Sequence, residues 1–91
     1  MEGKEVGFTV RLFREGGTYV AHVPELDVSS CGDTEAETRQ NIKDAVAGFL
    51  NTAEAQGTLV QILEEAGYRL EAGGWREPEI VSTERMRVRV A

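Results

Sequence analysis

Residues 24–45 read PELDVSSCGDTEAETRQNIKDA, and they contain the transition from strands to a helix. Pro24 has no backbone N–H, so it favours the end of a preceding strand over its interior. Thr34 followed by Glu37 has the spacing of a capping box, in which two side chains satisfy backbone N–H groups at a helix start. The segment therefore predicts a turn and a helix cap, and it contains no catalytic motif.

Two strands are expected before this segment. Residues 6–12 alternate between apolar side chains and polar or small ones, which is the period of a strand. Glu15-Gly16-Gly17 predicts a turn, because glycine adopts positive φ without a steric penalty. Residues 18–23 then return as a second strand, and residues 28–31 predict a short third strand.

Two helices are expected from Thr34 onward, and Gly57 separates them. Apolar side chains recur there at helical spacing, and Gly67 suits a helix C-terminus. We expect the sheet and the two helices to bury between them the side chains of Phe8, Val10, Ile42, Phe49, Leu50, Ile62 and Leu63.

Residues 80–90 alternate again, with Met86, Val88 and Val90 on one side and Arg85, Arg87 and Arg89 on the other. The predicted fold class is α+β, in the order β-β-β-α-α-β, within a single domain spanning residues 1–91. The sheet is expected to be mostly antiparallel, with both helices packed on one face. The last strand is expected beside the first and parallel to it, through a right-handed crossover.

Charge is unevenly distributed along the chain. The net charge is −6, and residues 24–68 alone carry nine acidic and two basic side chains, which gives −7. This acidic region argues against a surface that follows nucleic-acid phosphates and suits a basic protein partner, although it also serves solubility. Apolar runs are too short for a membrane span, so a cytoplasmic location is expected. Cys31 is the single cysteine and allows no internal disulfide.

The order and spacing of several short motifs resemble the HicB-type antitoxin family, specifically its N-terminal partner-binding domain. The similarity extends over roughly residues 5–90. The matching motifs are Tyr19 with Ala21, Pro24-Glu25-Leu26, Gly32-Asp33-Thr34, Asn41-Ile42 with Asp44-Ala45, and residues 62–68.

This resemblance implies a truncated ribonuclease-H-like fold and a non-enzymatic function. The implied partner is a small basic RNA-cleaving toxin of the HicA type. Many family members also carry a C-terminal DNA-binding segment. This chain ends one strand after Pro78, so we expect no such module. A homodimer or higher homo-oligomer is expected, because an open sheet edge gains by being paired or covered. The alternative is an orphan homo-oligomeric binding module.

The expected partner-binding residues are Glu25, Asp27, Asp33, Glu35 and Trp75. Asp33 could equally serve the helix cap, and Trp75 could fill the edge of the core. In the alternative function, nucleic acid would bind Arg85, Arg87 and Arg89, although that face could also be solvated or face a second copy.

A ribonuclease-H-like fold also raises the hypothesis of a metal-dependent nuclease. Such an enzyme needs a cluster of carboxylates that holds two metal ions. The resemblance implies that they would lie on the first strand, the first helix and the last strand. Residues 8–11 read FTVR and offer none, and Glu84 near the last strand cannot form the site alone. We therefore expect no catalytic residue, metal or cofactor. The single histidine, His22, is interpreted as a packed or surface side chain.

Overall fold

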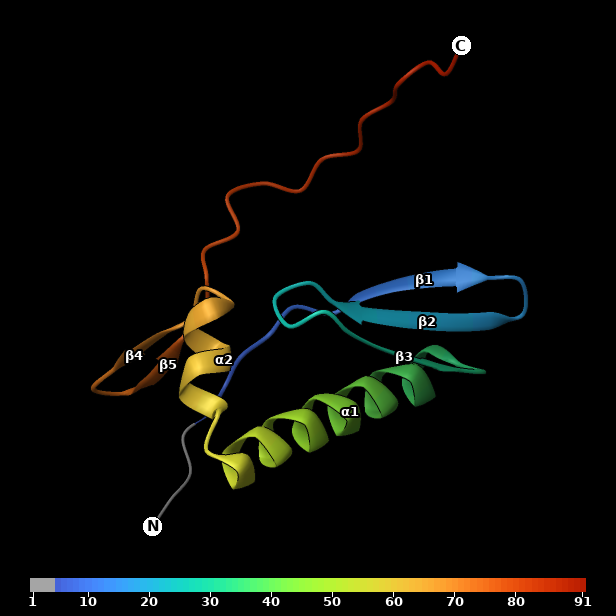
Figure 1. The fold of residues 1–91 in the computed structure, drawn as a ribbon. Coiled ribbons are helices and arrows are strands. Elements are labelled where there is room, and N and C mark those ends of the chain that lie inside the picture. The colour runs from blue at the N-terminus through green and yellow to red at the C-terminus, as the bar shows by residue number, and fades with distance from the viewer. Residues whose placement is uncertain (1–4) are drawn as a thin grey trace.

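The computed structural model describes residues 5–91. Its first part is an antiparallel meander (Figure 1) of β1 (Arg11–Glu15), β2 (Thr18–Val23) and β3 (Val28–Gly32), in that spatial order. Gly16 provides the tight turn between β1 and β2 with a φ of 63°.

A long helix, α1 (Glu35–Gln56), follows the meander and ends at Gly57, whose φ of 75° is left-handed. A short helix, α2 (Leu59–Glu65), comes next. The chain then forms a hairpin of β4 (Arg69–Glu71) and β5 (Gly74–Arg76), which pair as a separate two-stranded sheet. The α+β class and the order β-β-β-α-α-β are confirmed, with this hairpin as the β element that follows α2.

The main core lies between α1 and the three-stranded sheet. Ala21 and Val23 of β2 and Ile42 and Val46 of α1 are each at most 1% exposed. Thr38 is also fully buried on this face, and its hydroxyl donates to the Thr34 carbonyl oxygen at 2.6 Å. The buried helix residues are spaced by four, so the predicted apolar stripe of the first helix positions it on the sheet.

A second cluster joins α2 to the β4–β5 hairpin. Its buried members are Leu63, Tyr68 and Trp75. The Tyr68 hydroxyl donates to the Gly7 carbonyl oxygen at 2.6 Å, which fastens the segment before β1 to this cluster. In Figure 1, α2 stands beside the hairpin, whereas α1 alone runs along the meander. This differs from the expectation that both helices cover the sheet.

The expected last strand is not formed. Residues 77–91 contain no helix or strand, and Figure 1 shows them projecting from the hairpin, away from the body. The outer side of β1 is therefore unpaired within residues 5–91, contrary to the prediction of a parallel neighbour. The alternation in residues 80–90 specifies two faces of a strand, but it does not specify a hydrogen-bonding partner, and an extended segment is stable only with one.

The first strand begins later than predicted. β1 starts at Arg11, which pairs with His22, and Pro24 then limits how far β2 can continue the ladder. The backbone N–H of Thr9 donates instead to both carboxylate oxygens of Glu25, at 3.0 and 3.2 Å. A side chain thus replaces the strand pairing that the sequence pattern predicted.

The predicted core is partly corrected. Ile42 and Leu63 are buried, and Phe8, Leu50 and Ile62 are partly buried, but Val10 and Phe49 are each 37% exposed. Val10 lies beside the unpaired edge. Phe49 lies two helical turns, about 12 Å, beyond Asn41, whose amide donates to the Cys31 carbonyl oxygen on β3. The first residue of β3 lies only about 10 Å from Cys31 along the strand. Phe49 therefore lies past that end of β3 and has no strand residue opposite it.

Candidate binding surfaces

A groove runs between α1 and the unpaired edge of β1. It has a volume of about 470 Å³ and is lined by Phe8, Val10, Leu12, Ile42, Arg39 and Lys43. Its floor is apolar, and its helix side carries two cations. The sequence analysis assigned this position to the last strand, so it did not identify a groove here.

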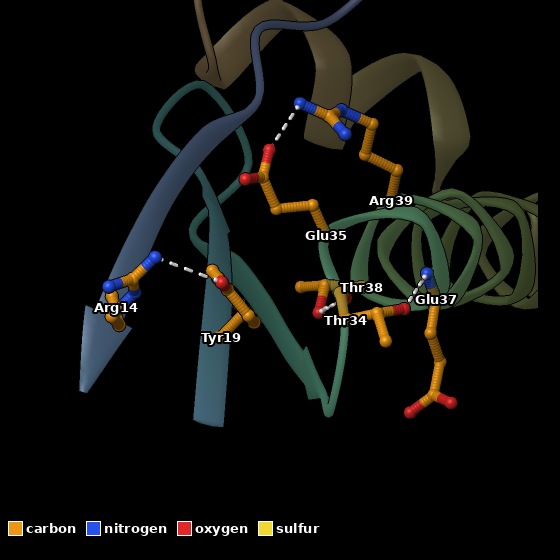
Figure 2. Close-up of polar contacts among 7 residues, drawn as sticks. All are labelled: Arg14, Tyr19, Thr34, Glu35, Glu37, Thr38 and Arg39. Atoms are coloured by element: carbon orange, nitrogen blue, oxygen red, sulfur yellow. Dashed lines mark hydrogen bonds and ion pairs between the residues drawn. The ribbon is translucent and has the colours of Figure 1, made fainter. Parts of the chain in front are cut away.

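The acidic start of α1 forms a second surface, shown in Figure 2. The backbone N–H of Glu37 donates to the Thr34 hydroxyl at 3.0 Å, and the Glu37 carboxylate accepts from the Asp33 backbone N–H at 2.9 Å. The Thr34 cap is the predicted one, whereas the reciprocal bond of the Glu37 carboxylate goes to Asp33, one residue before the cap, and not to Thr34 itself. Glu35 pairs with Arg39 at 3.1 Å, and both side chains are more than half exposed. The Asp33 carboxylate makes no hydrogen bond or ion pair within residues 5–91.

The turn between β2 and β3 carries the other two predicted acidic residues. Glu25 is partly buried and holds the Thr9 backbone, which is a structural role. Asp27 has a φ of 54°, and its carboxylate lies 2.9 Å from Nε2 of His22 while the side chain remains 94% exposed. Asp27 is therefore accessible to a partner.

The four predicted carboxylates do not form one patch. Glu25 and Asp27 precede β3, whereas Asp33 and Glu35 follow it. Five residues of extended strand separate the two pairs by about 16 Å. Closeness in sequence suggested one contact site, but the strand between them carries the pairs to opposite ends of the sheet.

Trp75 lies in the second cluster and is 9% exposed, so the structure supports its alternative role in the core. Arg85, Arg87 and Arg89 are exposed on the projecting C-terminal segment.

An aromatic-cation contact at the sheet end was missed by the sequence analysis. Arg14 donates to the Tyr19 hydroxyl at 3.1 Å, with its guanidinium carbon 5.4 Å from the ring centre (Figure 2). Only the register of β1 against β2 makes this pair visible.

The chemistry available to these surfaces is recognition by charge and by apolar contact. Within residues 5–91, no group of three or more His, Cys, Asp or Glu side chains lies close enough to hold a metal ion. Over the same residues, neither helix combines the length and apolar character that crossing a membrane requires.

Among the described residues 5–91, Tyr68 is the one group with a clearly perturbed acidity. Burial, with smaller contributions from the charges of Glu25 and Glu77, raises the pKa of Tyr68 to about 12. This perturbation accompanies a packing role, because the hydroxyl binds the Gly7 carbonyl oxygen.

Comparisons of this chain with models of known protein families, with curated proteins and with solved structures find no match.

Proposed function

We propose that this chain is a non-enzymatic, antitoxin-like domain that binds and neutralises a small basic RNA-cleaving toxin of the HicA type in the cytoplasm. The observation that carries the proposal is the charge of −7 between residues 24 and 68. In the fold, these residues form the β2–β3 turn, β3 and both helices.

The accessible carboxylates explain how such a partner would be recognised. Asp33 is exposed and has no partner side chain within residues 5–91. Glu35 is bound only by the exposed Arg39, an ion pair of the kind that contributes little to stability. Lysine or arginine side chains of a toxin can therefore engage both carboxylates at little energetic cost. Asp27 provides a second contact at the other end of β3.

Neutralisation then follows from occlusion. An RNA-cleaving enzyme needs a basic surface to hold phosphates, and an acidic domain that covers this surface competes with RNA. Opposite potentials steer the two proteins together and act mainly on the association rate. This role requires no reactive group on the antitoxin-like chain.

The test first asks whether an adjacent gene encodes a small basic protein, and then measures the binding of that protein to this chain. The triple variant Asp27→Asn, Asp33→Asn, Glu35→Gln should slow association and flatten its salt dependence. A matched control removes two carboxylates from α2, with Glu64→Gln and Glu65→Gln, and should leave the salt slope closer to that of the wild type. If the triple variant and the wild type associate at equal rates at low salt, the acidic surface is not the contact.

A second candidate function is nucleic-acid binding by an orphan module. It is favoured by the exposure of Arg85, Arg87 and Arg89 on the projecting segment. Changing these three residues to alanine should then abolish a gel shift, and wild-type binding should fall steeply with salt. Retention of nucleic acid without any protein partner would favour this function over the antitoxin-like one.

A further inference from the structure

The unpaired edge of β1 has the shape and chemistry to receive one more strand. β2 occupies one side of β1, and within residues 5–91 no strand lies on the other. The backbone groups along that side are open to a new partner. The groove directly beside this edge exposes apolar side chains, including Val10, at 37%, and Leu12.

The same chain carries a strand-like segment without a partner, residues 80–90. On its even-numbered face, Ile80 is 47% exposed, Met86 79%, Val88 90% and Val90 91%. The projecting segment also makes the molecule elongated. The radius of gyration is 15.4 Å, against about 12 Å for a compact chain of this length. A strand-like segment with an exposed apolar stripe gains stability by docking.

The register of the chain argues against docking on its own β1. A Cβ atom added to Gly7 would lie 2.5 Å from the Glu77 carboxylate, and one added to Gly74 would lie 3.9 Å from the Glu5 carbonyl oxygen. Residues 74–77 thus run beside residues 5–7 in the same direction. Because strands advance equally, at about 3.3 Å per residue, continued pairing sets residue 85 against residue 15, where β1 ends. Met86, Val88 and Val90 would then lie beyond the groove.

We propose that residues 80–90 of one copy add as a strand to the free β1 edge of a second copy, and that the exchange is reciprocal. In this dimer the register is not fixed by the Glu77–Gly7 contact. The even-numbered stripe can therefore lie over Phe8, Val10 and Leu12. Main-chain hydrogen bonds along β1 supply affinity, and the groove selects the apolar face, as in other cases of strand addition. Reciprocal exchange closes with two-fold symmetry and leaves no unpaired copy.

Charge and size fit this occupant. Glu84 shares the even-numbered face with Met86 and Val88, and the groove presents Arg39 and Lys43 from α1. Each copy contributes the eleven residues of the segment, residues 8–15 and three residues of α1. That set falls within the roughly 20–30 residues a side of a standard stable interface. Arg85, Arg87 and Arg89 lie on the other face of the added strand and stay accessible.

The oligomeric state tests whether the even-numbered apolar face of residues 80–90 forms the dimer contact. Light scattering with size exclusion at micromolar concentration should show a dimer for the full-length wild type. Val88→Asp should weaken the dimer at least tenfold, whereas the control Val81→Asp, on the odd-numbered face, should not. Both valines are about nine-tenths exposed in the single chain, at 90% and 89%, so neither substitution disrupts its core. A monomeric wild type, a dimer unaffected by Val88→Asp, or equal loss with both variants would overturn the proposal.

An intermolecular label distinguishes exchange from docking within one chain. The double variant Cys31→Ser, Arg89→Cys is prepared without isotope label and carries a nitroxide at position 89. This spin-labelled variant is then mixed with isotope-labelled wild type. Exchange predicts broadening of the amide signals of residues 8–15 in the mixed sample. Broadening that occurs only when spin label and isotope share one chain, or no broadening there at all, would refute it. The result does not depend on the proposed function, because no toxin or nucleic acid is present.

Discussion

Replacing Tyr68 with phenylalanine tests the joint between the second cluster and the segment before β1. The change keeps the buried ring and removes the hydroxyl that donates to the Gly7 carbonyl oxygen at 2.6 Å, across 61 residues of sequence. A lost hydrogen bond, with its acceptor left under-satisfied, should cost about 1–2 kcal/mol of unfolding free energy near pH 8. For a domain of this size, that corresponds to a fall in melting temperature of roughly 4–16 °C.

The same hydroxyl gives the variant a distinctive pH dependence. The pKa of Tyr68 is about 12 in the fold, against 10.0 for an ordinary tyrosine. Because the folded-state pKa is the higher one, the unfolded chain loses its proton first. The stability linked to Tyr68 is therefore full below about pH 10 and is lost as the pH rises toward about 12, at up to about 1.4 kcal/mol per pH unit. Tyr68→Phe lacks this loss.

Urea unfolding followed by circular dichroism, repeated across this alkaline range, measures both effects. The wild type should be more stable near pH 8, and its advantage over Tyr68→Phe should shrink to almost nothing by about pH 11. All other side chains are the same in the two proteins, so their contributions cancel in the comparison. A stability gap that stays constant across the range would show that the Tyr68 hydroxyl is not held in a buried hydrogen bond.

Four further substitutions test the main core and the helix start, each by denaturant melting. Ile42→Ala should cost about 2–5 kcal/mol of unfolding free energy because Ile42 is 1% exposed. Phe49→Ala should cost only about 1–2 kcal/mol because that ring is 37% exposed. Equal costs for the two variants would contradict the orientation of α1 on the sheet. Gly32→Ala should cost about 1–3 kcal/mol, since its Cβ would lie 2.8 Å from the Thr38 hydroxyl and 3.0 Å from the Thr38 backbone nitrogen; a neutral result would show that the cap can shift. Thr34→Ala should cost about 1 kcal/mol by removing the cap, and no loss would mean that solvent replaces it.

The elements set by local chemistry were predictable from the sequence. β2 occupies the predicted residues 18–23, and α1 begins after Thr34 and ends at Gly57 as expected. Each of these boundaries depends on a residue whose preference acts on its immediate neighbours: Pro24 has no N–H, the Thr34 hydroxyl accepts one, and Gly57 adopts positive φ. Such signals need no knowledge of what lies opposite in space.

The partner of each element was less predictable. The sequence analysis assigned no strand between Gly67 and residue 80. The two strands of the hairpin have only three residues each, and the hairpin depends on Trp75 packing against Leu63. Residues 80–90 have a clearer strand pattern, yet they are unpaired in the single chain. Periodicity reports which side chains share a face, whereas pairing is set by register and reach.

Among the candidate binding residues too, features set by neighbouring residues could be predicted, whereas features set by the pairing of strands in space could not. The capping role of the helix start could be predicted from the spacing of Thr34 and Glu37. The structure confirms the bond to the Thr34 hydroxyl and places the Glu37 carboxylate on the Asp33 backbone N–H, one residue before the cap. Asp27 and Asp33 lie on either side of β3, and the expected contact site grouped them by their closeness in sequence without accounting for the length of that strand. The groove beside β1 required knowing that an expected strand is absent from that edge.

Leu26 and Leu50 pack against both buried clusters and are the side chains shared by the two cores. The cluster of α2 and the β4–β5 hairpin is too small to form an independently stable unit. Cooperative unfolding of the whole chain therefore depends on these two leucines and on the Tyr68–Gly7 hydrogen bond. Loosening this joint would let the hairpin half open while the meander and α1 stay folded, and native-state hydrogen exchange would then resolve two protection levels in place of one.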